Sequence, residues 1–267
     1  MLFRSTPHVS GPIEKLYRYP FKGLSPELLS SVTLVAGKGF PMDRAWAITN
    51  GIAQVDRVHP KPMPKTDFLM LMLHERLALL RTSFADAGAV LSVEGDDVEA
   101  FSASLETAAG REQVEAFFTD YLWDAVGDGK PEVVSRPGHR FTDVSVVSES
   151  MMNAVSLINL KSVLALEAAA GKPTDPLRFR ANIYFDGERP WEEFDWLGRD
   201  ILIGDARGKV VLRTQRCPAT SVNPATAVRD RDVPAEIEKH FGHRDLGIYA
   251  ELQTGGVIKP GAMVRPA

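Results

Sequence analysis

Short strand-like runs, separated by glycine- and proline-rich turns, recur along the whole chain. Residues 13–19 alternate apolar and polar side chains with the period of a half-buried strand, and residues 31–36 and 44–48 predict two more strands. Two runs on either side of Asp86-Ala87-Gly88 predict a hairpin. Strands and helices do not alternate regularly. The pattern therefore favours a mainly β architecture with a few helices (α+β), built from barrels or sandwiches, over a Rossmann or TIM arrangement.

Three other segments carry stronger local signals. Apolar residues recur at helical spacing in 111–125, which predicts an amphipathic helix. Ser148 is the expected N-cap of a long helix over 148–170, and Gly171 is its expected stop. The apolar run at 68–73 predicts a buried strand.

Bulk properties exclude several classes of protein. The formal net charge is −4 and the pI is about 5.9, so nothing marks a nucleic-acid binder. One cysteine excludes an internal disulfide and suits a reducing compartment. The N-terminal residues have no apolar core of signal-peptide length, and no apolar run is long enough to span a bilayer. We therefore expect a cytoplasmic protein that contacts neither nucleic acid nor membrane.

The single cysteine, Cys217, lies among polar residues after a strand-rich segment. Arg213 and Arg216 precede it, and nearby positive charge favours the thiolate, which is a nucleophile and a soft metal ligand. A lone cysteine is more often a buried small hydrophobe. The polar neighbours of Cys217 favour the functional interpretation.

Four basic residues lie at strand ends or in loops. An anion such as phosphate would suit planar arginines and a lysine that converge on one place. For each residue alone, solvated surface charge is the simpler explanation. These residues are Lys22, Arg44, Arg178 and Arg180. Dinucleotide, phosphate-loop, zincin and nucleophile-elbow motifs are all missing from the sequence.

Five motifs carry a family resemblance across nearly the whole chain. They are Tyr19-Pro20-Phe21-Lys22, Gly39 to Trp46, Phe179-Arg180-Ala181-Asn182, Arg216-Cys217 with Thr220 to Pro224, and Gly247-Ile248-Tyr249. In this order they resemble the YPxKS, GLxxDRxW, FRPN, RCxxTTVDP and FGxY motifs of the MOSC superfamily, which is named after the C-termini of molybdenum cofactor sulfurases. The resemblance implies an N-terminal MOSC β-barrel domain over 9–127 and a MOSC domain over 128–267.

The resemblance also implies a molybdenum cofactor (molybdopterin) held between the two domains, with Lys22 and Arg44 facing Cys217. Cys217 would be the molybdenum ligand and the catalytic residue. The residues implied to hold the pterin and its phosphate are Lys22, Gly23, Arg44, Thr142, Arg180, Asn182 and Thr220.

Three positions depart from the family pattern. Gly23 replaces a serine hydroxyl, Ala181 replaces a proline, and Asn223 replaces an aspartate.

Three functions remain open. The first is an oxidoreductase that acts on a small N-hydroxylated or related substrate with an electron-donor protein. The second is a sulfur carrier that receives a persulfide on Cys217 from a sulfur-donor protein. The third is a binding module without metal.

Overall fold

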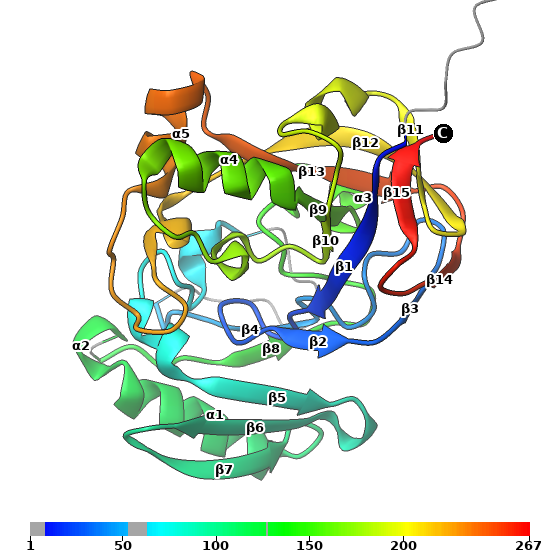
Figure 1. Ribbon diagram of the computed structural model, residues 1–267. Coiled ribbons are helices and arrows are strands. Elements are labelled where there is room, and N and C mark those ends of the chain that lie inside the picture. The colour runs from blue at the N-terminus through cyan, green and yellow to red at the C-terminus, as the bar shows by residue number, and fades with distance from the viewer. Residues whose placement is uncertain (1–8, 53–62, 127) are drawn as a thin grey trace, which may run out of the picture.

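A closed seven-stranded barrel forms the larger part of the described chain (Figure 1). Its strands are β1 (Gly11–Arg18), β9 (Val155–Asn159), β10 (Ile183–Phe185), β11 (Asp200–Ile203), β12 (Ala206–Gln215), β13 (Asp245–Leu252) and β15 (Met263–Pro266). The computed structural model describes residues 9–52, 63–126 and 128–267. Neighbours follow the order β10-β9-β13-β12-β11-β15-β1, and β1 returns to β10 to close the barrel. All pairs are antiparallel except β9 with β10.

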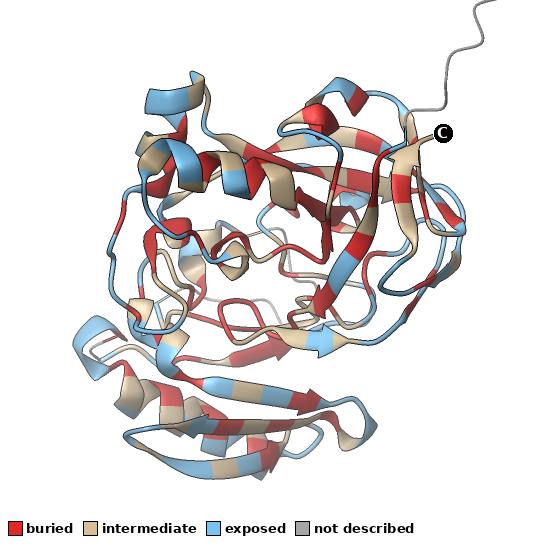
Figure 2. Ribbon diagram, viewed as in Figure 1, coloured by how far each residue is buried: buried red, intermediate tan, exposed pale blue. Residues whose placement is uncertain are grey.

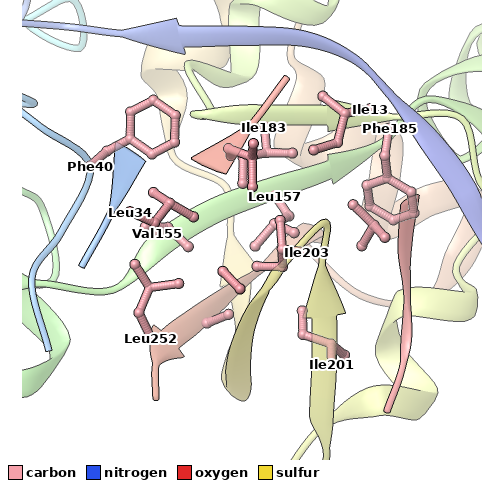
Figure 3. Packing of buried hydrophobic residues seen from close by; sticks show 14 of the residues in the cluster. Ile13, Leu34, Phe40, Val155, Leu157, Ile183, Phe185, Ile201, Ile203 and Leu252 are labelled. Carbon is pink, nitrogen blue, oxygen red and sulfur yellow. The ribbon is translucent and has the colours of Figure 1, made fainter. Parts of the chain in front are cut away.

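The inside of the barrel is an apolar core. Aliphatic side chains from facing strands meet there, including Ile13, Leu157, Ile183, Ile201 and Ile203, each at most 1% exposed (Figure 3). Full burial of one such side chain contributes about 1.5–3 kcal/mol. The core therefore holds the strands in place, and the functional groups lie at the barrel's edge.

Two helices cover one outer face of the barrel. They are α4 (Leu160–Ala170) and α5 (Val233–Phe241), which lie side by side in Figure 1. Both bury aliphatic residues, among them Val163 and Ile237, in a second cluster against the outer side of the barrel. Within the described residues, no helix is both long and apolar enough to cross a membrane.

Residues 81–126 form a smaller lobe beside the barrel. Its antiparallel sheet has β5 (Arg81–Ala85), β6 (Val90–Gly95) and β7 (Val98–Ser104), and α1 (Ala108–Tyr121) and α2 (Trp123–Val126) pack on it. Figure 2 shows buried residues both along this sheet and along the helix that packs on it. The short strands β4 (Trp46–Ile48) and β8 (Val133–Ser135) pair between this lobe and the barrel. The predicted hairpin is confirmed, and so is the helix expected over 111–125, which is divided into α1 and α2.

Strand pairing crosses the expected domain boundary. The N-terminal strand β1 pairs with β10 and β15 inside the barrel, and β2 (Glu27–Leu29) extends it. Likewise β3 (Val32–Leu34) pairs with β14 (Gly256–Ile258) from near the C-terminus. The boundary between 9–127 and 128–267 stays a prediction, but the first segment of the chain is built into the barrel. The fold class, mainly β with a few helices, is confirmed.

Two local predictions are wrong. The expected helix over 148–170 is instead α3 (Glu149–Met152), then β9, then α4. All five residues of β9 are buried, because one face of the strand lies in the barrel core and the other lies under the covering helices, and such a strand has no period that separates it from a helix. The run 68–73 forms a single bridge at Phe68, followed by turns. The capping signals still hold, because the Ser148 hydroxyl accepts from the Met151 amide and Gly171 ends α4 at φ 65°.

Glu193 makes a pH-dependent contribution to stability. It is fully buried in a 3₁₀ turn and accepts hydrogen bonds from Asn159 Nδ2 (3.0 Å) and Ser162 Oγ (2.9 Å). Burial raises the pKa of Glu193 from 4.5 to about 7, although both hydrogen bonds lower it. The folded state therefore binds this proton more tightly, and the resulting stability is lost as the pH rises from about 4.5 through about 7.

We expect this loss to be on the order of 3 kcal/mol of unfolding free energy for the native chain. Glu193→Gln removes the titration. Urea unfolding of both proteins at about pH 5 and about pH 8 measures the effect. The stability of the native chain relative to the variant should fall between the two values. A difference that stays constant with pH would contradict this role of Glu193.

Candidate functional site

A cavity of about 390 Å³ lies between the N-terminal loops and one edge of the barrel. All eight site residues predicted from the sequence line it. They are Lys22, Gly23, Arg44, Thr142, Arg180, Asn182, Cys217 and Thr220. The structure therefore brings together residues nearly two hundred positions apart, while their individual roles stay predictions.

The cavity wall is strongly cationic. Among its described lining residues, seven are lysine or arginine and only two are aspartate. The carboxylates are Asp43 and Asp143. An excess of positive charge in a partly enclosed space favours an anionic ligand such as a phosphate.

Arg44 and Arg180 form the centre of this charge. Both have left-handed backbones, at φ 49° and 51°, a conformation that costs free energy in residues other than glycine. Their guanidinium carbons lie 4.2 and 4.4 Å from the centroid of the Tyr19 ring. Arg44 donates from Nη1 to both carboxylate oxygens of Asp43, at 2.8 and 2.6 Å, and from Nη2 to the Arg180 carbonyl at 2.7 Å.

Among the described residues, Arg180 has no ion pair of the kind that Arg44 forms with Asp43. Burial, followed by the neighbouring charge of Arg44, lowers the pKa of Arg180 to about 10. Its Nη2 atom is buried and has no hydrogen-bond partner among the described residues. Since an unpaired buried charge is costly, this guanidinium is a ready donor for an anion.

Lys22 is already paired with an acid that the sequence analysis missed. Its Nζ donates to the Asp143 carboxylate and, at 3.1 Å, to the Phe141 carbonyl. Burial lowers the pKa of Lys22. Burial raises the pKa of Asp143, but the charges of Lys22 and Lys65 outweigh it, and the net shift is downward. Lys22 can therefore bind an anionic ligand only while it remains paired with Asp143.

The backbone conformation at position 23 favours glycine. Its φ is +83°, and a Cβ atom there would lie 2.7 Å from the carbonyl oxygen of Leu69. A serine at this position would strain the loop. The close approach of the Leu69 segment therefore accounts for glycine at this position, where the family motif has a serine hydroxyl.

Asn182 and Thr220 are partly engaged in holding the scaffold. The Asn182 Oδ1 atom accepts from the amide and the hydroxyl of Ser156, at 3.2 and 2.9 Å, and its Nδ2 donates to the Tyr17 carbonyl at 3.2 Å. This links the segment before β10 to β9 and β1. Thr220 Oγ1 donates to the Cys217 carbonyl at 2.9 Å. One amide hydrogen of Asn182 and the hydroxyl lone pairs of Thr220 remain for a ligand.

Cys217 lies just after β12, immediately before a 3₁₀ turn at Pro218–Ser221, and is partly exposed. The two arginines expected to frame it also line the cavity, but their hydrogen bonds and ion pairs are made with other residues. Arg213 pairs with Asp245 at 2.7 Å, and Arg216 donates to the carbonyls of Leu246 and Phe179 at 2.7 and 3.0 Å.

Lys65 provides positive charge near Cys217, and it was not among the site residues predicted from the sequence. Burial lowers its pKa, but Asp143 and the Cys217 thiol outweigh this and raise it overall. It also pairs with Asp143 at 3.6 Å. Its position in a lysine- and proline-rich loop gave no periodic signal.

Further buried polar atoms in the wall have no partner. They are Thr142 Oγ1, Arg178 Nε, Arg213 Nε and Thr214 Oγ1, which have no hydrogen-bond partner among the described residues. Nearly all buried polar groups in proteins are hydrogen-bonded, so unpaired groups in a cavity wall indicate a polar ligand. Together with the free donor of Arg180 and one accessible thiol, this wall fits the molybdenum cofactor, whose molybdopterin has a phosphate and a polar ring system and whose metal binds sulfur.

Known proteins are similar to this chain along most of its length. Two family models match in order, the MOSC N-terminal beta barrel domain at residues 10–125 and the MOSC domain at residues 142–265. Mitochondrial amidoxime-reducing component 1 of Homo sapiens is 23% identical across 94% of this chain and 81% of that protein. Mitochondrial amidoxime reducing component 2 of Rattus norvegicus is 27% identical across 59% of this chain, and the chain spans about half (49%) of its length. Molybdenum cofactor sulfurase of Bos taurus is 33% identical across 48% of this chain and 16% of its own length.

Proposed function

The chain belongs to the MOSC superfamily, and we propose that it binds the molybdenum cofactor in the cationic cavity and reduces small N-hydroxylated or related substrates. Cys217 would ligate the molybdenum through its sulfur. The relatives named amidoxime-reducing component support this activity. An electron-donor protein would supply two electrons, and with two protons from solvent these break the N–O bond of the N–OH group, leave N–H and release water.

One observation carries the proposal. A partly exposed thiol and a buried, unpartnered arginine donor, Cys217 and Arg180, line the same cavity. When bound, the cofactor supplies a metal centre that exchanges two electrons with the substrate. The chain's own part is to hold the phosphate with Arg180 and Arg44, to offer Thr142 to the ring system, and to present the thiol. Lys65, held by Asp143, keeps positive charge beside that thiol.

A sulfur carrier is the second candidate. Its support is the partial exposure of Cys217 and the match to a molybdenum cofactor sulfurase at 33% identity. In this case the Cys217 thiolate would attack the outer sulfur of a persulfide on a sulfur-donor protein, the donor's thiolate would leave, and the new persulfide on Cys217 would pass its outer sulfur on in the same way. The cationic cavity favours the cofactor enzyme, since a carrier needs only the thiol.

Metal and pterin analysis separates these functions. We expect protein purified from a host that makes the cofactor to contain molybdenum and pterin in amounts close to one per chain. Mass spectrometry of the metal and fluorescence of the oxidised pterin measure both. Protein with a cyanide-labile sulfur and little molybdenum would support the carrier instead. Protein with none of the three would leave a binding module without metal.

A further inference from the structure

The loop that carries Cys217 has little regular structure of its own. From Cys217 to Asn223 it contains one 3₁₀ turn. Arg178 supports this turn from inside the protein, since its Nη1 atom lies 3.3 Å from the carbonyl oxygens of both Thr220 and Ser221. Arg178 is only 5% exposed and forms part of the cavity wall, so what orients its guanidinium also orients the loop.

Asp230 orients Arg178. Its two carboxylate oxygens accept from Arg178 Nη2 at 2.8 and 2.7 Å, and one of them also accepts from Asn223 Nδ2 at 2.8 Å. Burial raises the pKa of Asp230, but the bonds from Arg178 and Asn223 outweigh it and lower the pKa overall. The Asp230 carboxylate thus connects Arg178, which supports the turn, to Asn223, the last residue of the loop.

The preceding residue, Arg229, makes its contacts in another part of the molecule. Its Nη1 donates to the carbonyl of Pro218, next to Cys217, at 3.3 Å. Its Nη2 donates to the carbonyls of Leu71 and Met72, at 3.1 and 2.7 Å, and to Glu75 at 3.0 Å. Arg229 therefore ties the cysteine loop to the N-terminal segment that forms the facing cavity wall.

We propose that Arg229 and Asp230 form a two-sided clamp that sets the position of Cys217 in the cavity. Both are positioning residues that act through Pro218 and Arg178. The clamp also explains Asn223, where the family pattern has aspartate. A carboxylate at 223 would lie about as close to Asp230 as the present 2.8 Å hydrogen bond, and the two charges would repel. The inference deepens the proposed function, because it concerns the same thiol, but it holds for any role of Cys217.

Alkylation of the thiol in cofactor-free protein tests the clamp. Cys217 is the single cysteine of the chain, so the rate of reaction with iodoacetamide reports on this residue alone. We expect Asp230→Ala, Asn223→Asp and the peripheral Arg229→Met each to raise the rate roughly tenfold, because losing a charge-assisted hydrogen bond shifts a local opening equilibrium by about that factor.

Asp232→Ala is the matched control. Asp232 caps α5 by accepting from the Ala235 amide at 3.2 Å, so its loss lowers the melting temperature without touching the loop. Its alkylation rate should stay at the native value. The clamp is refuted if Asp232→Ala accelerates alkylation as much as Asp230→Ala, or if Arg229→Met and Asn223→Asp leave the rate unchanged. None of these readings needs molybdenum, so they are independent of the metal analysis that tests the proposed function.

Discussion

Cys217→Ser is expected to lose most of its molybdenum while keeping much of the pterin. The serine hydroxyl is a hard, weakly acidic ligand and a poor replacement for soft sulfur. Changes at residues behind a metal ligand already cost about 10–100-fold in affinity, so replacing the ligand itself should cost on the order of 100-fold or more. Arg180, Arg44 and the Lys22–Asp143 pair remain to hold the rest of the cofactor.

Molybdenum and pterin content per chain measure this result, together with the reduction of an N-hydroxylated test compound by a chemical reductant. The native protein should reduce the compound, and the serine variant should not. Ala219→Ser is a suitable control, because it adds a hydroxyl to the same turn and leaves the thiol in place. If Cys217→Ser retains the native amount of molybdenum, the cysteine is not the ligand.

Arg180→Ala is expected to weaken retention of the cofactor by about 10–150-fold. The variant loses a charge-assisted hydrogen bond, which is worth about 1.5–3 kcal/mol. Arg180 should matter strongly because its Nη2 atom has no other partner among the described residues. Pterin content after extended dialysis measures the effect, and a melting curve checks that the variant is folded.

Arg44→Lys should also retain less pterin than the native chain. The two terminal nitrogens of Arg44 bond to different groups, Asp43 and the Arg180 carbonyl, and a lysine has a single nitrogen in place of this planar fork. Arg81→Ala provides the control, because Arg81 forms an exposed pair with Asp96 in the smaller lobe. Full pterin content in both Arg180→Ala and Arg44→Lys would show that the phosphate is bound elsewhere.

The sequence predicted those residues of the candidate site that belong to the family motifs. The eight residues carried over from the resemblance all line one cavity. Asp143, Lys65 and Asp230 were missed, since each acts through an ion pair with a residue distant in sequence. Asp143, for example, pairs with Lys22 across 121 positions. Such pairs have no spacing rule, because side chains meet only after the backbone has folded.

Local sequence determined the features that depend on neighbouring residues. The hairpin around 86–88, the N-cap at Ser148 and the helix stop at Gly171 follow from turn and capping chemistry within a few positions. Tertiary structure alone decided that β1 closes the barrel against β10 and that the apolar run of β9 is a strand inside the sheet. It also decided that Asp143 pairs with Lys22 and that Asp230 pairs with Arg178. The physical reason is the same in each case: burial, strand pairing and ion pairs depend on segments that are distant in sequence, and their free energy exceeds the weak local preferences that a sequence displays.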